Sequence, residues 1–332
     1  MGVITSLFAH KIIVAAAPQD ANELLDSIGL DPHAPADPKR MIEDTVYYDL
    51  LERLAERMDV TDLPLRTGAS MRCDDYGAVG LAWKAAPTLR GSYTRVTRYA
   101  RLWTSVVEYE LQPTEGGTFF FLHRTGVRRL GLRLSNEATL ASAVAISREV
   151  SPNGFSPKHV YLKHSAPAET TAHTAYFNCP VTFGAENDAL LLSDESLAQA
   201  TRLGDEGITR FLLSHLDAEL ATLQATEDTL ATRTRATIAR ALSEGVPKVE
   251  DIARSLGLSA RSFHRRLAEE GQSYQTLTDN TRRELAEGML AEDNHSLSEI
   301  AFLTGFSEQS AFTRAFKRWT GITPAQYRIT KS

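Results

Sequence analysis

Two short stretches near the C-terminal end of the chain carry side chains that could read DNA. They are GLSARSFHRRL at 257–267 and GFSEQSAFTRAF at 305–316, and each begins with glycine, an apolar residue and serine. If each stretch continues as a helix, one of its faces is rich in hydrogen-bonding groups of the kinds that recognise base edges in a major groove. Seven residues form these two polar faces: Arg261, His264, Arg265, Gln309, Ser310, Thr313 and Arg314.

The apolar residues of the same stretches indicate which side of each helix faces the protein. Phe263 and Leu267 are four residues apart, and Phe312, Phe316 and Trp319 follow one another at helical spacing. A polar face opposite such a stripe is also typical of an ordinary solvated helix. One stretch alone would leave both interpretations open, whereas two similar stretches favour recognition of nucleic acid.

Each polar helix is preceded by a second short helix. The segments VPKVEDIARSLGLS and SLSEIAFLTGFS share an acidic residue, Ile, Ala and then Gly, an apolar residue and Ser, and their glycines are 48 residues apart. Ser296 and Glu299 have the spacing of a capping box. We expect Ser259 and Ser307 to cap the polar helices. Helix, tight turn at glycine and helix form a helix-turn-helix unit, and the chain carries two.

The segment between the two units predicts the distance that separates them. Residues 274–290 would form a helix of about 25 Å at about 1.5 Å per residue. Recognition helices that enter successive major grooves on one face of DNA lie about 34 Å apart. A helix of this length is therefore a suitable strut between the two units.

The N-terminal half has a different pattern, with helices followed by short strands. We expect an α+β domain with a small, mostly antiparallel sheet, followed by an all-α double helix-turn-helix domain. The boundaries are 1–200 for the first domain, 201–225 for a linker helix and 226–332 for the second. The expected helices are 21–30, 41–58, 136–150 and 168–178, and the expected strands are 102–112, 117–125, 127–135, 159–164 and a pair within 181–193.

The linker helix carries a leucine stripe whose partner the sequence leaves open. Leu212, Leu216, Leu220 and Leu223 recur at helical spacing. The helix could dock on its own domain, or it could pair with a second copy of the chain.

Composition excludes several classes of protein. The 332 residues carry a net charge of −6, but residues 226–332 hold 15 Lys and Arg against 14 Asp and Glu, so the acidic excess lies before them. A protein that coats nucleic acid non-specifically would be basic. No stretch approaches the ~18–20 apolar residues of a membrane span, and no basic segment precedes the short apolar run near the N-terminus, so we expect no secretory signal.

The sequence also lacks the residue patterns that are typical of metal and catalytic sites. Cys73 and Cys179 are far apart, which predicts neither a disulfide nor a metal site and fits a reducing cytoplasm. The sequence has no glycine-rich phosphate loop and no Gly-x-Ser-x-Gly nucleophile motif. We therefore expect no cofactor, no metal and no enzymatic activity.

The second helix-turn-helix unit resembles the AraC/XylS family of bacterial transcription regulators. The match is SLSEIAFLTGFSEQSAFTRAFKRWTGITPAQYR at 296–328, including Gly321, Pro324 and the closing Tyr327–Arg328. The resemblance extends over about 226–330 and implies a seven-helix DNA-binding domain. It also implies that the seven polar residues named above read bases, and that Lys317 and Arg318 contact phosphates. A histidine at 264 departs from the glutamine or arginine that is more typical of the family.

The N-terminal half resembles the arabinose-binding-type effector domain of the same family, in the branch of the ornithine-utilisation regulators. The stretches that carry this resemblance are GLAWKAAPTLRGSYTRVTRYARLW at 80–103 and FNCPVTFGAENDALLLSDESL at 177–197. The resemblance implies a small-molecule effector of unidentified chemistry, and activation through contact with RNA polymerase.

Cations and aromatic residues concentrate just before the first expected strand of the sheet. A ligand carboxylate could pair with Arg95 or Arg98 while its apolar part meets Trp103 or Phe121. The same residues would also suit a helix with a solvated basic face and an aromatic core edge.

Together these patterns predict a cytoplasmic, sequence-specific transcription regulator, with double-stranded DNA as its partner and an effector that switches on activation. Linked half-sites on a homodimer would raise affinity further. In the alternative, the regulator responds to no effector and its N-terminal half only dimerises. A DNA-modifying enzyme is disfavoured because no nucleophile follows Cys179 near the expected DNA-binding helices.

Overall fold

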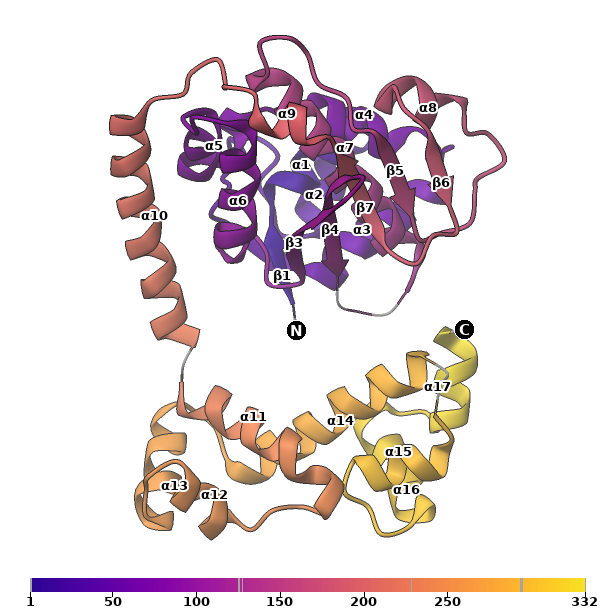
Figure 1. Ribbon diagram of the computed structural model, residues 1–332. Coiled ribbons are helices and arrows are strands. Elements are labelled where there is room, and N and C mark those ends of the chain that lie inside the picture. Colours follow the sequence, from indigo (N-terminus) through magenta and orange to yellow (C-terminus); the bar gives the residue numbers. More distant parts are fainter. Residues whose placement is uncertain (1, 125, 127, 228, 293–294, 332) are drawn as a thin grey trace. The chain divides into compact units, whose positions relative to one another are not determined.

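The computed structural model describes residues 2–124, 126, 128–227, 229–292 and 295–331 (Figure 1). The chain divides into two compact units, Met1–Ala221 and Thr222–Ser332. Each is described by itself below. In the described residues, no helix combines the length and the apolar character that crossing a membrane requires.

The N-terminal unit mixes helices with two sheets. Its helices are α1 (Leu7–Ala16), α2 (Ala21–Ser27), α3 (Asp44–Ala55), α4 (Leu63–Ser70), η1 (Cys73–Tyr76), α5 (Gly77–Lys84), α6 (Leu89–Tyr99), η2 (Ala100–Leu102), α7 (Leu130–Val150), α8 (Thr171–Phe177), α9 (Asp194–Ala198) and α10 (Glu206–Glu227), the last of which runs on into the second unit. Its strands are β1 (Val3–Thr5), β2 (Met41–Glu43), β3 (Val107–Thr114), β4 (Gly117–Arg124), β5 (His159–Leu162), β6 (Val181–Phe183) and β7 (Asp188–Leu192).

The larger sheet has the strand order β3-β4-β7-β5-β6, and the smaller one pairs β1 with β2. All neighbouring strands are antiparallel except β5 and β6, which are parallel. The mostly antiparallel sheet and the two strands expected within 181–193 are confirmed, but the expected pairing of these two strands with each other is wrong. Strand β5 lies between β6 and β7. Both strands therefore pair with a segment that begins about twenty residues earlier in the chain, and not with each other across the local turn.

Two further predictions for this unit are wrong in their element type. The segment expected as a strand at 127–135, whose first residue lies outside the described part, forms the start of α7 from Leu130. The helix expected at 136–150 is confirmed as the rest of α7. Its first turns resemble a strand in the sequence because leucine recurs there at every second position, at 130, 132 and 134. Residues 41–43, expected within a helix, form strand β2 against β1.

Buried residues of α5, α6, α7 and the strands β3, β4, β5 and β7 form most of the main hydrophobic core of this unit. It includes Trp83, Tyr93, Phe120 and Val144, all almost completely buried. Tyr93 lies between the other two aromatic rings, with centroid distances of 4.9 Å to Trp83 and 4.8 Å to Phe120. One face of the large sheet therefore packs on helices, and this packing surrounds the cavity described below.

Helix α10 docks on its own unit through part of its leucine stripe. Leu212 and Leu216 are buried in a cluster with Tyr99 and Trp103. This contact supports the first of the two alternatives for the linker helix. On the same helix, however, Phe211 is 73% exposed. An exposed apolar side chain is compatible with the second alternative, in which the helix pairs with a second copy of the chain.

The C-terminal unit consists of seven described α-helices joined by short turns. They are α11 (Leu230–Ala241), α12 (Val249–Ser255), α13 (Ala260–Glu269), α14 (Tyr274–Glu292), α15 (Leu297–Leu303), α16 (Gln309–Thr320) and α17 (Pro324–Lys331), with a 3-10 turn η3 (Leu242–Glu244) after α11. Helices α12 and α13 form one helix-turn-helix unit, and α15 and α16 form the other.

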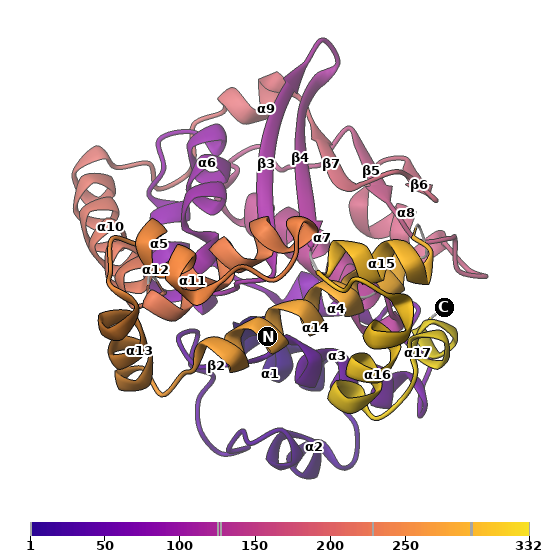
Figure 2. The ribbon, with the colours of Figure 1, turned by 90° about the horizontal axis from the view of Figure 1, so that it is seen from below.

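Helix α14 joins the two helix-turn-helix units and contributes to two separate cores. Leu277 packs with Phe263 and Leu267 around α11–α13, whereas Leu290 packs with Phe312 around α15–α17. Figures 1 and 2 show α11–α13 around one end of α14 and α15–α17 around the other. At 19 residues, α14 is about 28 Å long at about 1.5 Å per residue, which agrees with the expected strut.

Candidate nucleic-acid interface and ligand cavity

The same turn is built in both helix-turn-helix units. Gly257 has a φ of 72° and Gly305 a φ of 75°, a region that residues with a side chain rarely occupy. After each glycine the chain folds back on the first helix. The Leu258 N–H donates to the Ala253 carbonyl at 2.8 Å, and the Phe306 N–H donates to the Ala301 carbonyl at 2.8 Å.

The N-terminal caps differ between the two units. The Ser259 hydroxyl accepts a hydrogen bond from the Ser262 N–H at 3.2 Å, which confirms it as the cap of α13. The cap expected at Ser307 is wrong. Helix α16 begins at Gln309, after Glu308, without a side-chain cap, because the second unit has one more residue between the turn and the helix.

The capping box at the start of α15 is confirmed. The Ser296 hydroxyl accepts from the Glu299 N–H at 3.2 Å, and the Glu299 carboxylate accepts from the Ser296 N–H at 2.7 Å. These bonds lower the pKa of Glu299, so the box keeps its charge at neutral pH. At the end of the unit, Thr323 caps α17 in the same way, with Pro324 as the first helical residue.

The structure places the predicted base-reading residues on the outer sides of α13 and α16. All are exposed except Thr313, which is half-buried and donates its hydroxyl proton to the Gln309 carbonyl at 2.9 Å. Arg265 lies 3.5 Å from Glu269. In the described part of the chain the side chains of Arg261 and Arg314 form neither a hydrogen bond nor an ion pair, so their guanidinium groups are available to a ligand.

Two further predicted residues, Lys317 and Arg318, are exposed on the last turn of α16. Cations at this position also suit the negative end of the helix dipole. They lie about one turn from Arg314 along the same helix. This arrangement is compatible with a phosphate contact beside a base contact.

Sequence reasoning missed Arg282, which fixes the second helix-turn-helix unit to α14. Its guanidinium donates to the Thr304 carbonyl at 2.8 Å and to the Gly305 carbonyl at 3.1 Å, and lies 3.5 Å from the centre of the Phe306 ring. Burial lowers the pKa of Arg282. No local pattern could have shown this contact, because its partners lie more than twenty residues further along the chain.

The first helix-turn-helix unit is fixed by a carboxylate instead. Glu270, just after α13, accepts hydrogen bonds from the N–H groups of Leu230 and Ala231 at 2.9 and 2.8 Å. A carboxylate suits the positive N-terminal end of α11. This contact therefore connects the end of α13 to α11, the first helix of the C-terminal unit.

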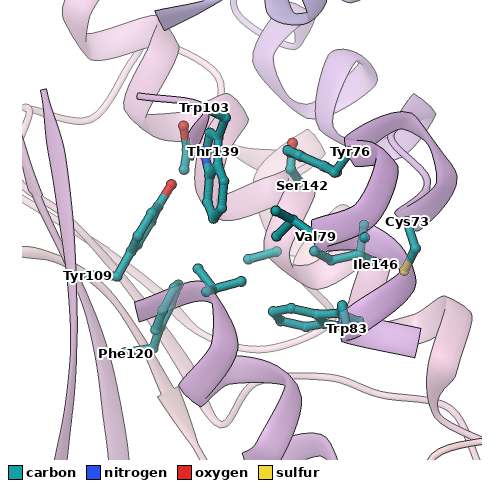
Figure 3. Close-up of a pocket in the computed structure, with 13 residues that line it drawn as sticks. Cys73, Tyr76, Val79, Trp83, Trp103, Tyr109, Phe120, Thr139, Ser142 and Ile146 are labelled. Atoms are coloured by element: carbon teal, nitrogen blue, oxygen red, sulfur yellow. The ribbon is translucent and has the colours of Figure 1, made fainter. Parts of the chain in front are cut away.

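A cavity of about 500 Å³, including its open mouth, lies inside the N-terminal unit (Figure 3). Among the residues that the structure describes, no charged side chain lines it. The lining residues come from η1, α5, α6, β3, β4, α7 and the segment after η2: Cys73, Tyr76, Val79, Gly80, Trp83, Val96, Trp103, Tyr109, Phe120, Thr139, Ser142, Ala143 and Ile146. Figure 3 shows Trp103, Thr139 and Tyr109 at one side of the cavity and Trp83, Ile146 and Cys73 at the other.

The hydroxyl groups of the lining are neutral, and those from α7 are already engaged. Burial raises the pKa of Tyr109 to about 12 and holds the pKa of Tyr76 well above its usual value. Thr139 donates to the Ser135 carbonyl and Ser142 to the Ala138 carbonyl, both at 2.8 Å. The Trp83 indole N–H is buried and has no acceptor in the described residues.

Only one of the four residues predicted to contact an effector lines this cavity. Trp103 does. The others, Arg95, Arg98 and Phe121, do not line it, so the predicted pairing of a ligand carboxylate with an arginine has no counterpart in this cavity and stays a prediction. Phe121 lies on the opposite face of the sheet, where its ring stacks 5.1 Å from that of Phe119. Side chains alternate along a strand, so its neighbour Phe120 faces the cavity.

Two arginines of α6, Arg95 and Arg98, contact α10 instead. Arg95 donates to the Ala82 carbonyl and, at 3.2 Å, to the Thr209 hydroxyl. Arg98 pairs with Asp217 at 2.8 Å, and the Tyr99 hydroxyl donates to the same carboxylate at 2.6 Å. The cationic cluster that suggested a ligand site therefore attaches the linker helix to the N-terminal unit.

Comparison with known families matches both units. Residues 19–201 match the family described as the N-terminal arabinose-binding domain of AraC transcription regulator. Residues 252–329 match a helix-turn-helix domain family. The second match covers the second helix-turn-helix unit and all of the first except the first three residues of α12.

Individual relatives match along most of the chain. An ornithine utilization regulator of Pseudomonas aeruginosa is 27% identical over 266 residues, which cover 80% of this chain and 78% of the relative. The transcriptional regulator VirS of Mycobacterium tuberculosis is 27% identical over 289 residues, which cover 84% and 82%. Among solved structures, the regulator CdpR of Pseudomonas aeruginosa matches 92% of this chain and 96% of its own with 20% identity and a TM-score of 0.45.

Proposed function

The chain belongs to the AraC family of DNA-binding transcription regulators, and we propose that it activates transcription when a small molecule binds in its N-terminal unit. Two helix-turn-helix units joined by one helix suit a site that spans two successive major grooves. The observation that carries this proposal is the pair of exposed polar faces on α13 and α16, each with an arginine that has no partner among the described residues.

We assign base reading to the seven predicted residues, and phosphate contact to Lys317 and Arg318. An unpaired arginine can donate two parallel hydrogen bonds to a guanine edge, and Arg261 and Arg314 are free to do so. Arg265 would first have to leave Glu269, 3.5 Å away. The near-neutral charge of this unit implies affinity that depends on specific contacts as well as on phosphates.

The test of base reading is Arg314→Ala, with affinity measured on a duplex selected from a random pool and on an unrelated duplex. The variant should lose about 1–3 kcal/mol on the selected duplex and almost nothing on the unrelated one. Arg233→Ala is the matched control, because Arg233 is exposed on α11, outside both helix-turn-helix units. An equal loss on both duplexes would make Arg314 a phosphate contact.

The effector response is supported by the cavity and by the attachment of α10. The cavity lies in the N-terminal unit, and α10 belongs to the same unit up to Ala221 and ends within the sequence of the second unit. Activation requires contact with RNA polymerase, in the cytoplasm where bacterial DNA is transcribed. Transcription in vitro from a promoter with the selected site should rise on addition of this protein. A fall at saturating protein would indicate a repressor.

A second candidate is a regulator whose N-terminal unit dimerises and binds no effector. Leu203 is 63% exposed, Ile208 54% and Phe211 73%, and the last two share one side of α10 at a spacing of three. We propose that these residues contact a second copy of the chain. Sedimentation should show a dimer that Phe211→Asp dissociates. A monomer at micromolar concentration would refute this contact, and a dimer without any ligand response would favour the second candidate.

A further inference from the structure

We propose that the cavity of the N-terminal unit binds an uncharged, mostly apolar small molecule that carries one hydrogen-bond acceptor. This inference rests on the proposed effector response, and it names the chemical class of the effector. It differs from the sequence-based expectation of a carboxylate that pairs with Arg95 or Arg98, because both arginines contact α10.

The absence of charge from the lining disfavours ionised ligands. None of the residues that line the cavity carries a charge, and a carboxylate moved into apolar surroundings without a partner loses most of its hydration energy. One cation, Arg124, is hydrogen-bonded to a residue of the lining. It donates to the Thr139 hydroxyl at 3.2 Å and to the Tyr48 hydroxyl at 3.1 Å, but it is not itself a lining residue.

The polar groups of the lining are too few for a sugar. A pentose carries several hydroxyls, each of which loses hydrogen bonds with water on burial. The hydroxyls of Thr139 and Ser142 donate to carbonyls of their own helix, and the rest of the lining is mainly aromatic and aliphatic. A ligand with a ring or short chain and few polar atoms is the better match.

The indole N–H of Trp83 is a buried donor of the lining that lacks an acceptor in the described residues. Trp83 is 2% exposed. A buried donor without a partner carries a free-energy cost that an acceptor would remove. We therefore assign the acceptor of the ligand to Trp83.

Trp103 provides a route from the cavity to the linker helix. It lines the cavity, and it also packs in the cluster that holds Leu212 and Leu216 of α10. A ligand that changes the position of this ring therefore acts on the helix that leads to the DNA-binding unit. Tyr99, which is bonded to Asp217, lies in the same cluster.

The experiment measures binding of a matched set of probes to the full chain. The probes are 4-propylphenol, propylbenzene, 4-propylbenzoate and L-arabinose. The first two are neutral at pH 7, since a phenol titrates at about 10, whereas the benzoate is charged. Two of the three tryptophans, Trp83 and Trp103, line the cavity, so intrinsic fluorescence reports binding directly and the shift in Tm confirms it.

The expected result is saturable binding of 4-propylphenol, weaker binding of propylbenzene, and none of the benzoate or the sugar. Trp83→Phe keeps a ring but removes the donor. This substitution should lower the affinity for 4-propylphenol by about 2- to 10-fold, the effect of one neutral hydrogen bond. The affinity for propylbenzene should not change. Loss of both probes would show that Trp83 acts through shape alone and would overturn its assigned role.

Two variants that fill the cavity locate the probe. Ala143→Leu and Val96→Phe each add volume to the lining from a different helix, and each should abolish the fluorescence change. Their circular dichroism and their affinity for DNA show whether they remain folded. If 4-propylphenol still binds to variants that fold, the site lies elsewhere and the proposal is wrong.

Other outcomes separate this inference from the proposed function. Tight binding of 4-propylbenzoate would overturn the uncharged class and assign the carboxylate to Arg124. Failure of both neutral probes, with DNA binding intact, would overturn the inference and leave the DNA-binding regulator standing. Failure of sequence-specific DNA binding would overturn the proposed function, whatever the probes do.

Discussion

The two helix-turn-helix units of the C-terminal unit have the same turn but different surroundings. Gly257 and Gly305 share a left-handed conformation, and the backbone bond that closes each turn has the same length. The first unit is tied to α11 by the carboxylate of Glu270, and the second to α14 by the guanidinium of Arg282. The turn is therefore set by local sequence, whereas each unit is held both by its own hydrophobic core and by a different long-range polar contact.

The exposed faces differ as well. Helix α13 presents Arg261, His264 and Arg265, and helix α16 presents Gln309, Ser310 and Arg314. Two identical faces would read the same bases twice. Two different faces on one scaffold suit a site with unlike halves, which a single chain can read in one orientation.

The largest effect is expected from the cores, which should respond alike. Phe263 and Phe312 are both fully buried, in separate clusters. Truncation of either to alanine should lower the free energy of unfolding by about 3–5 kcal/mol. Urea denaturation of the full chain, followed by hydrogen exchange, checks this. Phe312→Ala should raise exchange in α15–α17 more than in α11–α13, and an equal rise in both would show that the two cores are not independent.

The next effect distinguishes the two polar contacts. Arg282→Met keeps most of the apolar stem and removes the hydrogen bonds to Thr304 and Gly305. It should cost about 1.5–3 kcal/mol, as expected for hydrogen bonds from a charged group. Glu270→Gln keeps one acceptor oxygen for α11 and should cost less. Thermal unfolding of both variants compares the contacts, and a larger loss for Glu270→Gln would reverse the assigned order.

The glycines provide a smaller difference between the turns. Alanine at either position must adopt a positive φ, which costs about 1–2 kcal/mol. A Cβ at Gly257 would meet nothing within 4 Å, whereas one at Gly305 would lie 3.1 Å from the Leu242 side chain and carbonyl. We therefore expect Gly305→Ala to be the more destabilising in urea titration. Equal costs would mean that η3 moves away without strain.

The smallest expected effect concerns the caps. Ser259→Ala should cost about 1 kcal/mol, the usual value of a capping hydroxyl, because this hydroxyl accepts from the Ser262 N–H. Ser307→Ala should cost almost nothing, since Ser307 does not cap α16. The two variants are matched in chemistry and in exposure. Similar losses in their free energies of unfolding would show that Ser307 stabilises the second unit in another way.

The helix-turn-helix units were predictable because their signals are local. The apolar spacing around Phe263 and Phe312, the turn glycines and the capping box at Ser296 each act within a few residues. The prediction that Ser307 caps α16 is wrong for a local reason too, since α16 begins one residue later after its turn than α13 does.

The N-terminal unit was less predictable because its contacts are not local. Strand β5 inserts between β6 and β7, and the first turns of α7 carry leucines at every second position, a spacing typical of a strand. The cavity brings together residues from Cys73 to Ile146. Phe120 and Phe121 are adjacent and chemically identical, and only the register of β4 decides which one faces the cavity.

The most direct test of the central claim is the site that each variant selects. The wild-type chain, Arg261→Ala and Arg314→Ala are each used to select duplexes from a random pool. The account predicts two conserved segments about 10 base pairs apart, with Arg261→Ala relaxing bases in one segment only and Arg314→Ala in the other only. A single segment, or one segment affected by both substitutions, would contradict the claim that the two units read DNA side by side.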